Sequence, residues 1–296
     1  MRTGSLVMRL IATVSVLVIL VSVYLVLIRP TQLQSGATRE EVEGAMPGDD
    51  LVSHPTFLAT RAITIRGRPE EIWPWIAQMG FDRAGYYGYD LIENLGSKRG
   101  IRSAESIVPE LQHPKPGDLM PISSVAHLVF GTIEPDHYLI WQSEVIPHDG
   151  AFTWALYPID EGHTRLVSRI RLRYHRTSLA LVLDLFTEFA DHVAVPEILA
   201  GVKGRVEGQG RETLTGEAIE IATWTLAFVL LTAGIVFIFR WRRWWRAWCF
   251  ALGSGFLIFF VLYARAPTWI GAALGGAIST VAFLLSRDNS RQSWHV

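Results

Sequence analysis

The sequence contains a single cysteine, Cys249, which excludes an intrachain disulfide and any cysteine-based metal cluster. Its nine histidines include no pair at a spacing of three or four residues, and none lies beside a carboxylate in a known metal-ligand pattern. We therefore expect no metal and no cofactor. The sequence also lacks a nucleophile elbow, a Walker loop and a dinucleotide fingerprint, so it offers no motif for a familiar catalytic centre.

The chain also lacks a substantial net charge, because its 27 basic residues are balanced by 28 acidic ones. A near-neutral chain gives no general reason to expect a nucleic-acid partner. Hydrophobic residues, by contrast, make up 50% of the 296 residues, and the mean hydropathy is +0.26. Much of this excess lies in runs at the two ends of the chain, which predicts insertion into a membrane.

Four uncharged runs are long enough to cross a bilayer. They occupy residues 10–28, 221–239, 247–264 and 266–286. The first run also has the layout of a secretory signal peptide. It is longer than a usual signal-peptide core, however, and no cleavage site of small residues follows Ile28, which favours an uncleaved anchor. We therefore expect an anchor at 1–28 and a three-helix membrane region at 218–288.

Residues 240–246 contain four arginines interleaved with three tryptophans. This pattern is compatible with a nucleic-acid patch, but its position between two apolar runs favours an interfacial aromatic belt in a cytoplasmic loop. With that loop in the cytoplasm, four spans place both termini there too. The prediction is a multi-pass protein of the cell membrane, with the polar domain outside the cytoplasm.

The polar part of the chain reads as strands enclosed by helices. Residues 63–66 alternate as a half-buried strand, and Pro69 fits the first position of a helix that Pro74 should bend. Further on, the pattern predicts two antiparallel hairpins and a long amphipathic helix. The hairpin strands are expected at 125–133, 137–145, 151–157 and 163–174, and the helix at 178–206. The resulting class is α+β.

Three segments in this region carry a family resemblance: PEEIWPWIAQMG at 69–80, GYYGYDLIENLG at 85–96 and SAESIVPELQ at 103–112. In this order they resemble the membrane-associated bacterial branch of the SRPBCC superfamily, which has the helix-grip or START-like fold of polyketide cyclases and lipid-transfer domains. The resemblance covers a domain at 59–210, preceded by a linker at 29–58. It implies a deep apolar cavity between a curved sheet and a long C-terminal helix.

Aromatic side chains are dense around this region, where they serve either as core packing or as the wall of a ligand pocket. The candidates for a ligand-binding cavity are Trp73, Met79, Tyr86, Tyr87, Tyr89, Glu93, His127, Trp141 and Trp154. No residue is assigned a catalytic or metal-binding role.

Two charged groups have competing interpretations. Asp90 and Glu93 are suited to general acid–base chemistry near the tyrosines, but their spacing favours a capping box for a helix at 91–95. A stripe of arginines lies on one face of the last strand, at positions 165, 169, 171 and 173. It could bind an anionic lipid headgroup, although a solvated outer face is the simpler interpretation.

The function favoured by the sequence is a membrane-anchored START-like domain that buries a hydrophobic or amphipathic, lipid-like small molecule. The expected partners are therefore this molecule and the membrane. A first alternative is an enzyme of the cyclase or dehydratase type acting on a polyketide-like or isoprenoid substrate, in which Asp90, Glu93, Tyr89 or His127 would move protons. A second is a structural or sensory membrane protein without a ligand.

Overall fold

The computed structural model describes residues 3–145, 148–173, 178–209, 213–240, 244–263, 270–271, 273–278 and 280–281. The chain forms two compact units. One consists of Thr31–Leu214, and the other combines Met1–Pro30 with Thr215–Val296.

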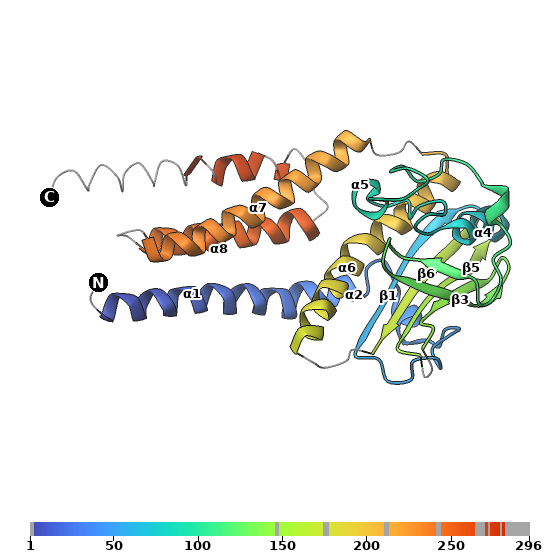
Figure 1. The fold of residues 1–296 in the computed structure, drawn as a ribbon, viewed down its shortest axis with the longest axis horizontal. Helices are drawn as coiled ribbons and strands as arrows, with labels where there is room; N and C mark the ends of the chain where they lie inside the picture. Colours follow the sequence, from blue (N-terminus) through green and yellow to red (C-terminus); the bar gives the residue numbers. More distant parts are fainter. Residues whose placement is uncertain are drawn as a thin grey trace. The chain divides into compact units, whose positions relative to one another are not determined.

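The unit at 31–214 is built on one curved antiparallel sheet of six strands, shown in Figure 1. The strands follow the order β1-β6-β5-β4-β3-β2. Their bounds are β1 (Phe57–Arg66), β2 (Leu119–Pro121), β3 (His127–Glu134), β4 (Tyr138–Gln142), β5 (Gly150–Asp160) and β6 (His163–Leu172). Both predicted hairpins, β3–β4 and β5–β6, are present.

Four helices complete this unit. They are α3 (Arg39–Glu43), α4 (Pro69–Gln78), α5 (Asp90–Glu93) and the long α6 (Ser178–Val206), with a short 3-10 turn η2 at Pro109–Leu111. Helix α4 begins at Pro69 as predicted, and its Glu71 side chain accepts a hydrogen bond from the Arg68 N–H at 2.7 Å. It continues through Pro74 as a single helix.

The main core lies between α4, α6 and the inner face of the sheet. Fully buried aliphatic side chains from all three parts meet there, among them Ile72 of α4, Leu166 of β6 and Val202 of α6. An antiparallel sheet that wraps a long C-terminal helix in this way is the helix-grip arrangement that the sequence resemblance predicted.

The outer face of the sheet differs from the prediction. The sequence reads as a linker over 29–58, but part of this segment covers the strands. Met46 is buried against Ala62, Ala155 and Val167, and Val52 packs on Ile140 and Ala151 in a second cluster. The segment shows no regular spacing of apolar residues because most of it is not a helix or strand. Its few apolar side chains are buried one by one against the sheet.

The arginine stripe is correspondingly covered, and the expectation of a solvated face is wrong. Arg165 donates to both carboxylate oxygens of Glu41, at 2.8 and 2.7 Å. Arg169, whose side chain is only 3% exposed, lies 2.7 Å from the Asp49 carboxylate, which Arg171 also approaches. Alternation placed these arginines on one face correctly, but their partners come from more than 100 residues earlier in the chain.

The second unit is helical. It contains α1 (Thr3–Val23) and the π-helical turn η1 (Tyr24–Ile28), together with α7 (Leu214–Arg240) and α8 (Trp244–Tyr263). A short helix α2 (Arg29–Leu33) follows η1 and crosses the boundary between the two units at Pro30. Among the described residues three helices are long and apolar enough to cross a membrane, where the sequence predicts four. Much of the fourth predicted span, 266–286, lies outside the described residues.

Polar contacts join α1 to both α7 and α8. The Arg9 guanidinium of α1 donates to the carbonyls of Ile238 and Phe239 at the end of α7, and the Trp248 indole of α8 donates to the Ser15 hydroxyl at 2.9 Å. Arg9 therefore supplies donors to backbone acceptors that the end of a helix leaves unsatisfied. The N-terminal end of α1 lies beside the C-terminal end of α7.

Candidate functional site

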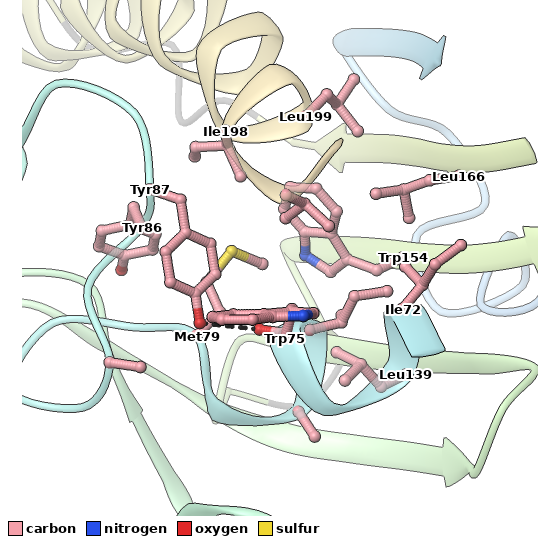
Figure 2. Close-up of a cluster of buried hydrophobic side chains, with 14 of the residues drawn as sticks. Ile72, Trp75, Met79, Tyr86, Tyr87, Leu139, Trp154, Leu166, Ile198 and Leu199 are labelled. Carbon is pink, nitrogen blue, oxygen red and sulfur yellow. Dashed lines mark hydrogen bonds between the residues drawn. The ribbon is translucent and has the colours of Figure 1, made fainter. Parts of the chain in front are cut away.

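The candidate site is the aromatic part of the main core, which we call the inner cluster. Its members are Trp73, Trp75, Met79, Tyr86, Tyr87, Trp141 and Trp154. Figure 2 shows side chains from α4, α6 and the sheet converging around Trp154. Six of the nine predicted cavity residues therefore come together in one buried group.

The sheet register places two tryptophans side by side in this cluster. Trp154 on β5 is opposite Leu139 on β4, and Trp141 is opposite Phe152, so the two indoles are diagonal neighbours on the inner face. Their ring centroids lie 5.4 Å apart. Both side chains are almost fully buried.

Neither indole N–H has a hydrogen-bond acceptor among the described residues. A buried tryptophan usually finds a partner for its N–H, because an unsatisfied buried donor costs about 1–3 kcal/mol. Two adjacent indoles with the same deficit are an uncommon arrangement in a closed core. The two N–H groups can therefore donate hydrogen bonds to an oxygen atom of a bound molecule or water.

A third donor belongs to the same face. The cross-strand register aligns Arg61 of β1 with Ser168 of β6, and Ser168 with Trp154 of β5. Arg61 Nη2 is buried and also lacks an acceptor among the described side chains. The inner face therefore carries a polar row, formed by Arg61, Ser168 and the Trp154 N–H, beside the apolar residues of the main core.

The two tyrosines of the cluster, by contrast, have satisfied hydroxyls. Tyr86 donates to the Pro121 carbonyl, and Tyr87 donates to the Trp75 carbonyl, each at 3.0 Å; the Tyr87 bond is the dashed line in Figure 2. Burial raises the pKa of both phenols far above their usual range, so they keep their protons and remain donors. They position the loop and do not serve as bases.

Asp90 holds that loop in place, and the predicted capping box is wrong. Tyr89 occupies the N-cap position of α5, where no side-chain cap bond forms. The Asp90 carboxylate instead accepts bonds from the Ser103 hydroxyl at 2.6 Å, from the Ser103 N–H at 3.1 Å and from the Asn94 amide at 3.1 Å. These contacts tie α5 to a segment thirteen residues ahead, a pairing that local spacing does not reveal.

Helix α6 packs closely against the backbone of Tyr87 at Gly201. A Cβ atom at Gly201 would lie 2.0 Å from the Tyr87 carbonyl oxygen, so only glycine permits this approach. Arg205, one turn later, lies with its guanidinium carbon 4.3 Å from the centroid of the Tyr87 ring. The sequence prediction missed Ser103, Asn94 and Gly201; a glycine inside an apolar helical pattern was the one available signal.

Three predicted residues lie elsewhere. His127 is exposed, and its Nε2 atom is 3.5 Å from the Glu144 carboxylate. Tyr89 is buried but belongs to the start of α5, while Glu93 is half-buried beside Gly88. Among the residues that the structure describes, no group of three histidine, cysteine, aspartate or glutamate side chains is arranged to hold a metal ion.

No family model and no curated protein matches the sequence. Solved structures that are similar include the Polyketide_cyc-like protein Cgl2372 of Corynebacterium glutamicum, with 12% identity, coverage of 51% of this chain and 91% of that one, and a TM-score of 0.32. Aha1 of Colwellia psychrerythraea matches at 12% identity over 52% and 100% of the chains, with a TM-score of 0.29. The di-domain ARO/CYC protein BexL matches at 13% identity over 51% and 47%, with a TM-score of 0.32. At this low similarity no ligand or activity is carried over.

Proposed function

We propose that the unit at 31–214 binds an amphipathic, lipid-like small molecule within the inner cluster. The observation that carries the proposal is the pair of buried indole N–H groups of Trp141 and Trp154, which have no acceptor among the described residues. Aromatic and aliphatic walls would take up the apolar body of the molecule at roughly 25 cal/mol per Å² of buried surface. An acceptor oxygen would satisfy the indoles.

The polar row argues for an amphipathic ligand and against a pure hydrocarbon. Arg61 Nη2 lies on the same inner face as Trp154 and is a further unmet donor. A hydrocarbon would leave these donors unsatisfied, whereas a molecule with carbonyl, ester, hydroxyl or carboxylate oxygens offers acceptors for them. The proposal includes no covalent step, since Asp90 is engaged by Ser103 and Asn94.

We further propose that the helices α1, α7 and α8 insert in the cell membrane and keep the ligand domain close to it. Their length and hydropathy support insertion. Arg9 brings the start of α1 to the end of α7, where Arg240 lies, and in the sequence further arginines follow Arg240. By the positive-inside rule that end is cytoplasmic, which leaves the 31–214 domain outside the cytoplasm.

Mass spectrometry of the purified full chain tests the proposal. The native spectrum should show a mass above that of the polypeptide, and the denatured sample should release a discrete amphipathic compound with at least one acceptor oxygen. The Trp154→Phe variant, which removes one indole N–H, should retain less of this compound. Wild-type protein that carries no compound under native conditions, with its fold intact, would overturn the proposal.

A further inference from the structure

A second site lies in the helical unit, in a groove between α8 and the residues Ala277, Ile278 and Val281. Its volume is about 440 Å³. The residues that matter for its chemistry are Trp245, Arg246, Cys249, Gly253, Ile278 and Val281. Apart from the head group of Arg246 at one end, the lining is almost entirely apolar.

The groove is polar at the end near Arg246 and apolar along the rest of α8. Arg246 and Trp245 belong to the first turn of α8, where the guanidinium carbon lies 5.7 Å from the centroid of the Trp245 ring. Cys249 and Gly253 follow one and two turns further along a helix that is apolar enough to span a membrane. An arginine and a tryptophan at the end of such a span lie at headgroup depth, and the positions after them lie at acyl-chain depth.

From this arrangement we propose that the groove binds an anionic phospholipid. Its phosphate contacts the Arg246 guanidinium, and one acyl chain lies along Cys249, Gly253 and Ile278. Charge complementarity selects an anionic headgroup over a zwitterionic one, because an arginine near the surface attracts anionic lipid. The site rests on the membrane insertion proposed above, but it is separate from the inner cluster and its ligand.

A larger side chain at Gly253 would test whether the groove holds lipid. Among the described residues, no heavy atom lies within 4 Å of a Cβ atom added at this position, so the space beside it is open in the part of the chain that the structure describes. A Gly253→Leu substitution can therefore fill the groove from the α8 side without displacing a neighbouring helix. In a hydrocarbon surrounding, that open space is occupied by lipid.

The experiment is native mass spectrometry of the full chain released from bilayer discs that contain equal amounts of phosphatidylglycerol and phosphatidylcholine. We expect wild-type protein to retain phosphatidylglycerol about five-fold more than phosphatidylcholine. Arg246→Gln should abolish the preference, Arg246→Lys should keep most of it, and Gly253→Leu should reduce retention of both lipids. Arg240→Gln, which removes the same charge at the end of α7, is the matched control and should behave as wild type.

Several results would overturn the proposal. These are equal retention of the two lipids by wild-type protein, an unchanged preference in Arg246→Gln, or an equal loss in Arg240→Gln. A dimer without bound lipid would assign the groove to a second copy of the chain. Extraction of membranes with alkaline carbonate tests insertion separately, so a failure of the membrane proposal is distinguished from a failure of the lipid site.

Discussion

The guanidinium of Arg61 on β1 and the carboxylate of Asp191 on α6 lie 2.7 Å apart, with side chains that are 1% and 4% exposed. Arg61 also donates through Nε to the Gln32 carbonyl at 2.9 Å. One residue thus joins the long helix, the first strand and the segment that leads into the domain. Because two charges are removed from water here, the pair is stable only while both partners are present.

Breaking this pair should destabilise the domain strongly. We expect Arg61→Met to lower the free energy of unfolding by about 3–5 kcal/mol, since it leaves the Asp191 carboxylate buried without its partner. The double variant Arg61→Met, Asp191→Leu should lose less than Arg61→Met alone. Thermal unfolding of the full chain in detergent, followed by tryptophan fluorescence, measures this. Arg39→Met, at an exposed pair with Glu43, is the control and should change stability by less than about 0.5 kcal/mol.

Two glycines of α6 should respond oppositely to alanine. Gly201→Ala forces a methyl group against the Tyr87 carbonyl oxygen, so we expect a clear drop in melting temperature. Gly204 lies one turn away, and beyond its own helix backbone no heavy atom of the described residues lies within 4 Å of an added Cβ. Gly204→Ala should therefore stabilise the helix by about 0.5–1 kcal/mol. Equal melting temperatures for the two variants would contradict the close approach of α6 to the Tyr87 loop.

Substitution of Asp90 distinguishes two roles for this residue, which are to anchor the loop through Ser103 and to cap helix α5. Asp90→Ala removes the acceptor of three donors, and we expect a loss of about 2–3 kcal/mol. Hydrogen exchange at the Tyr87 amide, which donates to the Ser103 hydroxyl at 3.0 Å, should accelerate as well. A helix cap predicts a loss of only about 1 kcal/mol with Tyr87 unaffected. Adding Ser103→Ala to Asp90→Ala should cost little more, because both act on one network.

Acid should weaken the contact between Glu41 of α3 and Arg165 on the outer face of the sheet. Partial burial raises the pKa of Glu41, but hydrogen bonds from Arg165 and Thr38 outweigh it and hold the pKa below its ordinary value. The stabilisation by Glu41 is therefore complete above the unfolded-state pKa of about 4.3 and is lost as the pH falls through the folded-state pKa.

We accordingly expect Glu41→Gln to be less stable than wild type by about 1 kcal/mol at pH 7, with the difference shrinking as the pH falls below about 4.3. Melting curves across this pH range provide the test. Glu43→Gln alters a carboxylate two residues away whose partner Arg39 is largely exposed, so it should follow the wild-type profile. A Glu41→Gln deficit that does not shrink at all as the pH falls would show that packing, and not charge, is responsible.

Local patterns predicted the elements of the fold well. Alternation located both hairpins, Pro69 marked the start of α4, and the apolar runs located α1, α7 and α8. The resemblance in residues 69–112 then supplied the helix-grip arrangement. The aromatic candidates on α4, β4 and β5 could be identified because large buried side chains are conspicuous in sequence.

The errors share one physical cause, which is that the decisive contacts join distant segments. Glu41 meets Arg165 and Asp90 meets Ser103 through tertiary packing that no local period encodes. His127 is the first residue of β3 and is exposed, because Leu128 and Phe130 are the residues of this strand that face the main core. The unmet donors of Trp141 and Trp154 are likewise a property of the assembled core.

The central claim is that these two indoles donate to a bound oxygen, and nuclear magnetic resonance of ¹⁵N-tryptophan-labelled full chain tests it most directly. Trp141→Phe and Trp154→Phe assign the two indole signals, and Tyr86→Phe controls for loss of a donor that already has an acceptor. We predict that both indole proton signals move downfield in the protein as purified, relative to protein extracted with organic solvent and refolded. Indole signals that are identical in the two samples, while the extract contains the released compound, would contradict the account.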